Sequence, residues 1–356
     1  EILLKILVLP ADGIGPEIVS AAEAVLFAAD QRFKLQISLE HEIVGFESLK
    51  KFSITIRPEI LEKAKTFDGI ILGPQSHADY PAPEDGGVNI SASFRVGLDL
   101  YANIRPARTR EGLGLGKEGL DLVIMREATE GFYPDRNCYK GWGEVMLSSD
   151  MAISTRKITR HCCDRIARRA FELAMKRRKK VTAVHKANSF HMTDGLFLEC
   201  VDNAAKEFPE VETEDILIDA VTAHLVRHPE RFDVIVATNF YGDIISDLAS
   251  ELSGSLGLAG SVMASDEFCT AQAQHGSAPD IAGQNIANPV SMILSVAMLL
   301  QWGAEKFERA ELGHAANAME TAVDRVLSNA TKRTPDLGGQ GNTDTFAEAV
   351  AAELLQ

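Results

Sequence analysis

Residues 2–19 read ILLKILVLPADGIGPEIV, an apolar run that ends at a turn and leads into an alanine-rich helical pattern. This order predicts a strand, a tight turn at residues 12–15 and a helix beginning near Pro16, a helical position that tolerates proline. The turn also holds the first two glycines of a GxGxxG-like spacing, which is typical of pyrophosphate-binding turns. However, Ile18 replaces the third glycine, and Glu17 would place a negative charge beside the phosphates. The residues favour a plain strand–turn–helix connection.

Further short apolar runs alternate with amphipathic helical stretches along the chain. They lie at residues 69–72, 120–125, 181–184, 216–218 and 234–237. Such alternation is typical of α/β proteins with a largely parallel sheet, whose sites follow the carboxyl ends of the strands. The residues that follow each run are therefore the first candidates for a functional site.

Composition narrows the class of protein. The chain has 356 residues, 46% of them hydrophobic and 24% charged, which is typical of a globular protein long enough for two domains. A net charge of −15 disfavours a nucleic-acid partner. Residues 290–302 form an apolar run too short for a bilayer, so we expect a buried helix and no membrane partner. Five cysteines without metal-site spacing and no visible secretory segment favour reduced thiols and a cytoplasmic location.

Three aspartates follow or flank these apolar runs. Asp243 and Asp247 are four residues apart and share one face of a predicted helix. Such a pair is more often an exposed helix face than a site, although the apolar neighbours indicate partial burial. Asp219, which ends the apolar run ILID, offers a third carboxylate. Three such oxygen donors make Mg²⁺ or Mn²⁺ binding plausible.

Arginines and a lysine form a second pattern. Arg105 precedes a proline and Arg126 follows an apolar strand, whereas Arg95 lies in a predicted helix. Each could equally be a surface ion-pair residue, but converging guanidinium groups beside a metal would bind a polycarboxylic acid. Lys186 ends a strand and Tyr133 follows Arg126 by seven residues, so they are candidates for a base and a proton donor.

The chain resembles a known family over nearly its whole length. The stretches that carry the resemblance are LPADGIGPEIV, YANIRPAR, MREATEGFY, HKANSFHMTDGLFLE, ATNFYGDIISDLASELSGSLGLAGS and HGSAPDIAGQNIANP. They are similar to signatures of the β-decarboxylating dehydrogenases, the isocitrate/isopropylmalate dehydrogenase family. The resemblance implies a two-domain α/β fold that is not of the GxGxxG Rossmann type. It places residues 1–100 and 253–356 in a larger domain with the cofactor loops, and residues 101–252 in a smaller domain with a dimer interface.

The resemblance also implies roles for the candidate residues. Asp243 and Asp247 of one subunit would bind the metal together with Asp219 of the partner, in a homodimer with shared active sites. The substrate carboxylates would bind to Arg95, Arg105 and Arg126. Lys186, from the partner and near Asp219, would act as base or proton relay at the C2 hydroxyl. Tyr133 would protonate the enolate left after CO₂ departs.

Cofactor binding is implied in loops outside the first turn. By resemblance, the cofactor lies against residues 253–258 and 275–283, with contacts from His275, Gly276, Ser277, Ala278, Asp280 and Asn288. A carboxylate at Asp280 can hydrogen-bond ribose hydroxyls and would repel a 2′-phosphate. We therefore predict NAD as the cofactor.

The substrate depends on the segment before Arg95. Asn89 and Ser91 favour a polar C3 group, as in isocitrate or homoisocitrate, whereas Val88 and Ile90 keep 3-isopropylmalate as an alternative. D-malate or tartrate is a further alternative. A regulatory subunit of a hetero-oligomer and a solute-binding protein are the non-enzyme alternatives, disfavoured because every implied catalytic residue is present and no export signal is visible. The segment at residues 132–145, FYPDRNCYKGWGEV, matches no family member that we can place.

Overall fold

A computed structural model describes residues 3–356, so residue 2 of the predicted first strand lies outside the described part. Contacts divide the chain into two compact units. Unit 1 comprises the described residues up to Leu100, together with Arg110–Leu115 and Ser255–Gln356. Unit 2 comprises Tyr101–Thr109 and Gly116–Gly254. Both units are α/β, which confirms the predicted fold class.

The strands of unit 1 follow the order β2-β1-β3-β12-β11. Their bounds are β1 Leu4–Leu9, β2 Ile37–His41, β3 Gly69–Leu72, β11 Val262–Ala264 and β12 Cys269–Gln272. All neighbouring pairs in this order are parallel except β11–β12. The helices of unit 1 are α1 Gly15–Phe33, α2 Phe46–Phe52, α3 Pro58–Ala64, α4 Ile90–Gly97, α9 Val290–Lys306, α10 Ala310–Ser328 and α11 Thr343–Leu355.

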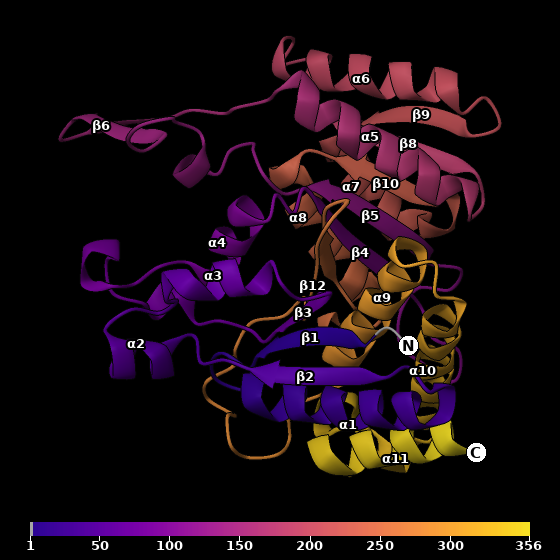
Figure 1. The fold of residues 1–356 in the computed structure, drawn as a ribbon. Coiled ribbons are helices and arrows are strands. Elements are labelled where there is room, and N and C mark those ends of the chain that lie inside the picture. Colours follow the sequence, from indigo (N-terminus) through magenta and orange to yellow (C-terminus); the bar gives the residue numbers. More distant parts are fainter. Residues whose placement is uncertain (1–2) are drawn as a thin grey trace. The chain divides into compact units, whose positions relative to one another are not determined.

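Helices cover the unit 1 strands and explain why β1 is almost wholly apolar. Helices α1 and α11 pack side by side, and α9 packs against both α1 and β12 (Figure 1). The predicted buried helix at residues 290–302 is confirmed as α9, and the Asn288 side chain accepts from the backbone N–H of Val290, the first residue of this helix, at 3.0 Å. Strand β1 ends at Leu9, shortly before the turn at residues 12–15.

The main strands of unit 2 follow the order β4-β5-β10-β8-β9. Their bounds are β4 Ala102–Arg108, β5 Asp121–Glu127, β8 Lys180–His185, β9 Glu212–Leu217 and β10 Val234–Ala237, and a hairpin is formed by β6 Glu144–Ser148 and β7 Met151–Ser154. The helices are α5 Arg160–Met175, α6 Thr193–Glu207, α7 Ile218–Arg227 and α8 Asn239–Leu252. Only β4 and β5 pair antiparallel in the five-strand order.

Strand β10 shows why the central strands are uniformly apolar. Val234 and Val236 belong to a core with α5 and α6, whereas Ile235 and Ala237 belong to a second core with α7 and α8. Because side chains alternate across a strand, both faces must be apolar when helices cover both. The predicted runs at residues 69–72 and 234–237 are confirmed as β3 and β10.

One predicted strand end is wrong. The run at residues 216–218 was expected to be a strand ending at Asp219, but β9 ends at Leu217 and α7 begins at Ile218. Strand β9 (ETEDIL) is half exposed and mostly polar, so its apolar pattern is visible only at its last residues. Asp219 consequently lies in the first turn of α7, where the helix dipole favours a carboxylate.

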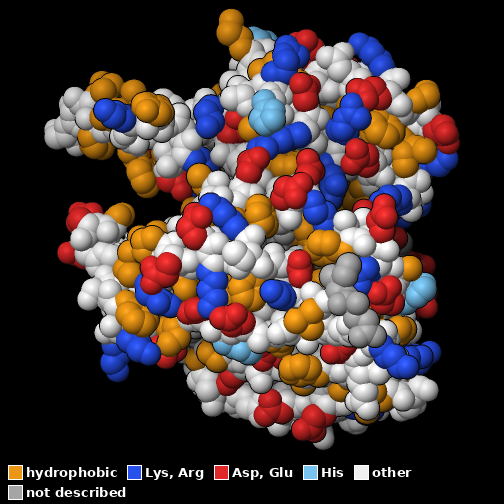
Figure 2. Space-filling model, viewed as in Figure 1, with side chains coloured by type: hydrophobic (Ala, Val, Ile, Leu, Met, Phe, Trp, Pro, Cys, Tyr) orange, Lys and Arg blue, Asp and Glu red, His pale blue; other side chains and the backbone are white. Residues whose placement is uncertain are grey.

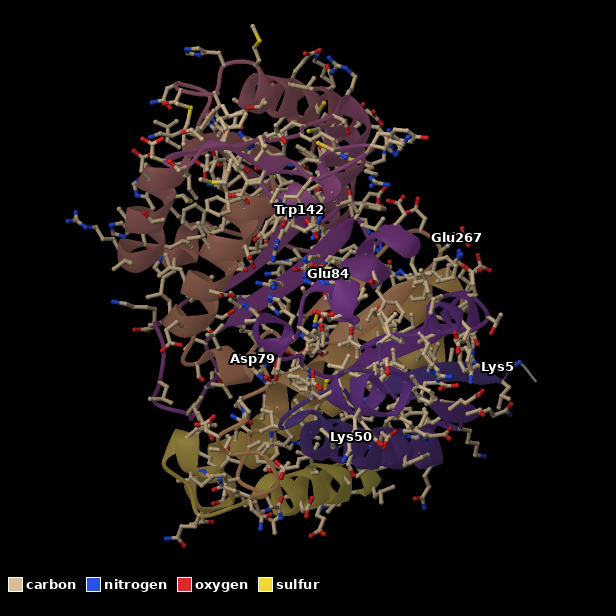
Figure 3. All side chains as sticks on the ribbon, turned by 90° about the vertical axis from the view of Figure 1, so that its left-hand side faces the viewer. Lys5, Lys50, Asp79, Glu84, Trp142 and Glu267 are labelled. Carbon is tan, nitrogen blue, oxygen red and sulfur yellow. The ribbon has the colours of Figure 1, made fainter. Side chains whose placement is uncertain are left out.

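The hairpin formed by β6 and β7 projects from the rest of unit 2 (Figure 1). All its strand residues are exposed, and apolar side chains gather on it (Figure 2). Trp142, labelled in Figure 3, lies in the segment leading into β6 and is 57% exposed. Within residues 3–356, no helix combines the length and apolar character that a bilayer crossing requires.

Candidate functional site

The turn at residues 12–15 packs against the loop that begins at His275. The backbone N–H of Ile14 donates to the carbonyl of Ser277 at 2.8 Å. A Cβ at Gly13 would lie 2.0 Å from that same carbonyl oxygen, and Gly13 has a φ of +57°. The first glycine therefore permits close contact between two backbones of unit 1, which agrees with a plain connection and not a pyrophosphate cradle.

Asp12 braces this turn. Its carboxylate accepts from the backbone N–H of Phe46 at 2.8 Å, from that of Ser76 at 3.1 Å and from the Tyr80 hydroxyl. Burial, followed by the Asp12 carboxylate, raises the pKa of Tyr80, so this phenol stays protonated and keeps donating. Asp12 thus ties the strand end to two other segments of unit 1.

The ring of His275 has one nitrogen that is hydrogen-bonded and one that has no hydrogen-bond partner among the described atoms. Its Nδ1 lies 2.9 Å from the carbonyl of Gly276, which can only accept, so Nδ1 carries the proton. Burial lowers the pKa of His275, which favours the neutral ring. The Nε2 atom is then an acceptor, and it is buried with no hydrogen-bond partner among the described atoms. An exocyclic amino group such as that of adenine would supply the missing donor.

The other predicted cofactor residues divide into two groups. Gly276 and Asp280 are exposed, Ala278 is half-buried with a φ of +39°, and a Cβ at Gly276 would meet nothing within 4 Å, so a ligand can approach the loop backbone. Ser277 and Asn288 are instead engaged within unit 1. Ser277 pairs with Ser76 at 2.6 Å, and Asn288 donates to Asp336 at 3.0 Å. These two residues shape the loop.

Helix α4 and its N-cap residue supply three of the predicted substrate residues. Asn89 caps the helix by accepting from the backbone N–H of Ala92 at 3.0 Å. Ser91 donates to Gln272 Oε1 at 3.2 Å, and Arg95 Nε lies 3.0 Å from Met263 Sδ. Gln272, on β12, is a neighbour of the predicted site that sequence reasoning missed, since nothing in its local pattern links it to Ser91.

Unit 2 brings five predicted residues into one cluster, which we call the arginine–aspartate cluster: Arg105, Arg126, Tyr133, Asp243 and Asp247. Arg105 Nη1 lies 3.2 Å from a carboxylate oxygen of Asp243 and 3.2 Å from one of Asp247. Arg126 also pairs with Asp243, and the Tyr133 hydroxyl donates to Asp243 Oδ2 at 2.5 Å. The shared helix face predicted for Asp243 and Asp247 is confirmed.

Two guanidinium groups held this close form a receptor for anions. Burial, and then the neighbouring Arg126 cation, lowers the pKa of Arg105 to about 10, so the Arg105 guanidinium remains charged at neutral pH. Burying two cations requires anionic partners, and Asp243 and Asp247 supply them here. A substrate carboxylate could bind the same bidentate donors.

Helix α8 positions this cluster through residues that sequence reasoning missed. Asn239 is fully buried and accepts from Arg126 Nε at 2.8 Å while donating to the carbonyl of Glu130 at 2.9 Å. A Cβ at Gly242 would lie 2.7 Å from Arg126 Cγ, so glycine lets this side chain lie against the helix. Asn239 and Gly242 both lie in the stretch TNFYGD, but only the fold shows which residues they contact.

Lys186 and Asp219 form a separate pair in unit 2. Lys186 Nζ lies 2.9 Å from Asp219 Oδ1, and this contact lowers the pKa of the Asp219 carboxyl. In the part of the chain that the structure describes, neither residue hydrogen-bonds to the arginine–aspartate cluster. A single chain therefore does not join Asp219 to Asp243 and Asp247.

The donor chemistry of these aspartates fits a hard divalent cation only in part. Carboxylate oxygens are the ligands that Mg²⁺ and Mn²⁺ prefer. Across residues 3–356, no group of three or more His, Cys, Asp or Glu side chains is arranged to hold a metal. Asp243 and Asp247 could supply two carboxylate ligands to such a cation.

The residue that follows Arg126, Glu127, carries a buried carboxylate that sequence reasoning also missed. Glu127 is 2% exposed and accepts from the backbone N–H groups of Thr129 and Glu130 at 2.9 Å each. Burial raises the pKa of Glu127 to about 7, against the opposing effect of these hydrogen bonds. The sequence did offer one signal for this residue, the two glutamates in the stretch MREATE at the end of a predicted strand.

Replacing Glu127 should remove a pH dependence of stability. In the folded chain Glu127 keeps its proton up to about pH 7, whereas an unfolded glutamate loses it near 4.5, so stability is lost as the pH rises between these values. The shift corresponds to about 3 kcal/mol. Because an unfolded glutamate is already mostly ionised at pH 5, urea unfolding at pH 5 and pH 8 should show about 2.5 kcal/mol less loss for Glu127→Gln than for the wild type.

The exposed variant Glu199→Gln is the matched control for this experiment. Glu199 pairs with Arg160 on the surface, and its pKa is lowered by that contact. Its pH dependence between pH 5 and pH 8 should therefore equal that of the wild type. Equal slopes for Glu127→Gln and the wild type would contradict the assignment.

The chain is similar to known proteins over nearly its whole length. The sequence model described as "Isocitrate/isopropylmalate dehydrogenase" matches residues 5–350. An isocitrate/homoisocitrate dehydrogenase of Thermus thermophilus is 40% identical over 351 residues, covering 98% of each chain. A 3-isopropylmalate dehydrogenase of Archaeoglobus fulgidus is also 40% identical, covering 98% of this chain and 99% of its own. A crystal structure of isocitrate dehydrogenase from Methylococcus capsulatus is similar with a TM-score of 0.87 at 37% identity, covering 99% of this chain and all of that one.

Proposed function

Because the chain belongs to the isocitrate/isopropylmalate dehydrogenase family, we propose that it catalyses NAD- and divalent-metal-dependent oxidative decarboxylation of a 3-substituted (2R)-malate with a polar C3 group. Isocitrate and homoisocitrate are the leading substrates. Dehydrogenases of this family generally use NAD(P) and a divalent metal. The observation that carries the proposal is the arginine–aspartate cluster, which joins anion-binding guanidinium groups to carboxylate ligands and a phenol.

The proposed roles follow from the chemistry of each side chain. Arg105 and Arg126 bind substrate carboxylates bidentately, and Arg95 provides a further cation. Lys186, in its neutral amine form, takes the proton of the C2 hydroxyl, and Asp219 orients the Nζ atom. Tyr133, whose hydroxyl proton points to Asp243 in this structure, gives a proton to the carbon that has lost CO₂. When bound, NAD would supply a hydride acceptor, and Asp219, Asp243 and Asp247 would hold Mg²⁺ or Mn²⁺, which would supply a Lewis acid.

This assignment of roles requires a homodimer with shared sites. Lys186 and Asp219 contact each other and not the arginine–aspartate cluster of their own chain. The exposed apolar side chains of the β6–β7 hairpin, among them Val145, Met146 and Ile153, offer a surface that association would bury. We therefore propose that each chain supplies Lys186 and Asp219 to the site of a second copy.

NAD is favoured over NADP by the loop at residues 275–288. The buried Nε2 of His275 fits an adenine amino group. The exposed carboxylate of Asp280 suits ribose hydroxyls and would repel a 2′-phosphate. Unit 1 alone therefore carries the proposed adenosine contacts.

The polar C3 group is supported by helix α4. Ile90 is fully buried in the core of unit 1 and offers no apolar lining for an isopropyl group, whereas Val88 packs against the same core and stays partly exposed. Ser91 keeps a hydroxyl directed at Gln272, on the partly exposed side of the helix. The second candidate is 3-isopropylmalate, because a relative of that name is as similar as the isocitrate/homoisocitrate enzyme.

The test is NADH formation with Mn²⁺ against isocitrate, homoisocitrate, 3-isopropylmalate, D-malate and tartrate, repeated with NADP. We expect the highest kcat/KM with isocitrate or homoisocitrate and with NAD. Preference for 3-isopropylmalate would overturn the polar C3 group, and a higher kcat/KM with NADP would overturn the role of Asp280. Inactivity with every acid would overturn the proposed function.

A further inference from the structure

A buried arginine of unit 2 lies outside the proposed roles. Arg156 follows β7, and its side chain is only 6% exposed. Its guanidinium pairs with the carboxylate of Asp194, which is fully buried, and donates to Thr193 Oγ1 at 3.0 Å. Burying such an ion pair is costly unless both partners are well satisfied. The pair should therefore fix the segments of unit 2 that it contacts.

The second oxygen of Asp194 binds the segment that carries the proposed base. The backbone N–H of Lys186 donates to Asp194 Oδ2 at 2.6 Å. The carbonyl of Lys186 in turn accepts from the backbone N–H groups of Ser189 and Phe190 at 2.9 and 2.8 Å. The backbone of Lys186 is thus fixed on both sides, with Asp194 as the link between it and Arg156.

Arg156 also contacts the beginning of helix α8. Its Nη2 donates to Thr238 Oγ1 at 3.1 Å, and Thr238 is the residue that precedes α8. The carbonyl of Thr238 accepts from the backbone N–H of Gly242 at 2.9 Å in the first turn. The same guanidinium therefore holds the helix that carries Asp243 and Asp247.

Aromatic rings complete the surroundings of Arg156. Its guanidinium lies over the rings of Phe132, Phe190 and Tyr241, 4.7, 5.4 and 5.3 Å from their centroids. Phe132 directly precedes Tyr133, and its ring packs edge-on against Phe190 at 6.0 Å. The cation thereby touches the segment of the proposed proton donor as well.

We propose that Arg156 and Asp194 form a positioning pair that fixes the Lys186 segment, the Tyr133 segment and the start of α8 in one arrangement. This inference rests on the proposed function for the roles of Lys186 and Tyr133. Neither Arg156 nor Asp194 takes part in the chemistry. Under the shared-site proposal, Lys186 belongs to the site of the partner, whereas Tyr133 and α8 belong to the chain's own site. The Arg156–Asp194 pair then connects these two sets of residues.

The test compares Arg156→Met and Arg156→Lys with a matched control, Arg177→Met, in the full-length protein. Arg177 also forms an ion pair in unit 2, with Asp233 at 2.8 Å, and that carboxylate is buried, but its contacts lie with Asp121 and Asp233 and not with the site. Two quantities are measured: kcat and KM on the best acid of the panel, and hydrogen exchange of the backbone amide of Lys186 by mass spectrometry. The exchange measurement needs no substrate.

For Arg156→Met we expect kcat to fall roughly 10- to 100-fold with KM within about twofold, as misplaced catalytic groups produce. The Lys186 amide should exchange at least about tenfold faster, because its acceptor is released. Arg156→Lys, which keeps the charge and the fold, should lie between the wild type and Arg156→Met in both measurements. Arg177→Met should lose stability but keep kcat and the exchange rate of Lys186.

Unchanged exchange at Lys186 in both Arg156 variants would overturn the positioning role, and so would a kcat equal to that of Arg177→Met. Failure of the proposed function gives a different result, namely a wild type that is inactive on every acid. In that case the exchange rates alone still decide whether Arg156 and Asp194 fix the Lys186 segment.

Discussion

Mixing two inactive variants, Lys186→Ala and Asp243→Asn, should restore activity. Each change alone should lower kcat at least about 100-fold, because the first removes the proposed base and the second a proposed metal ligand. In a dimer with shared sites, a mixed pair combines Lys186 of one chain with Asp243 of the other. Random reassociation of equal amounts makes roughly half of the dimers mixed, each with one intact site of two, so about a quarter of the wild-type activity should return.

The control mixture is Lys186→Ala with Asp219→Asn. These two side chains contact each other at 2.9 Å within one chain, so they enter the same site from the same subunit. No mixed dimer then contains an intact pair, and the activity should stay at the level of the single variants. Recovery in this control, or none in the first mixture, would show that the site is not divided between chains in the proposed way.

The sequence predicted strands β1, β3, β5, β8 and β10 because their apolar runs are short and bounded, but it did not predict β2, β4, β11 and β12. Strands β3 and β10 match the predicted ranges since both faces of each are buried, which leaves no polar residue to blur the run. Strand β9 was mostly missed because it is half exposed, and the hairpin of β6 and β7 was missed because all its strand residues are exposed. Periodicity reports burial, so it detects strands only where the fold buries them.

The candidate site was predictable as a set of residue types but not as a set of contacts. Asp243 and Asp247 are four apart on a helix, so a common partner could be expected, and Arg105 is that partner. Asn239, Arg156 and Asp194 could not be found in this way. Their partners lie between eight and 113 positions away in the chain, so only the tertiary structure brings them together.

Replacing Gly13 by alanine should unfold the turn that opens unit 1. The new Cβ would lie 2.0 Å from the carbonyl oxygen of Ser277 and 2.8 Å from its carbonyl carbon, and backbone atoms cannot move aside as a flexible side chain can. The positive φ adds strain for any residue with a Cβ. Together these effects should lower the free energy of unfolding by about 2–4 kcal/mol, measured by urea unfolding. Because Ser277 belongs to the proposed cofactor loop, NAD affinity measured by calorimetry should fall with it.

Gly195→Ala is the control for this change, since a Cβ at this position in helix α6 meets nothing within 4 Å. It should raise stability by about 0.5–1 kcal/mol, because alanine favours a helix more than glycine does. The pair also separates two explanations of the first glycine. A turn that bound a pyrophosphate through its N–H groups would lose NAD affinity on Gly13→Ala without losing stability. A turn that serves as the contact surface for the backbone of Ser277 must lose stability first, and its NAD affinity can fall only through the displaced loop.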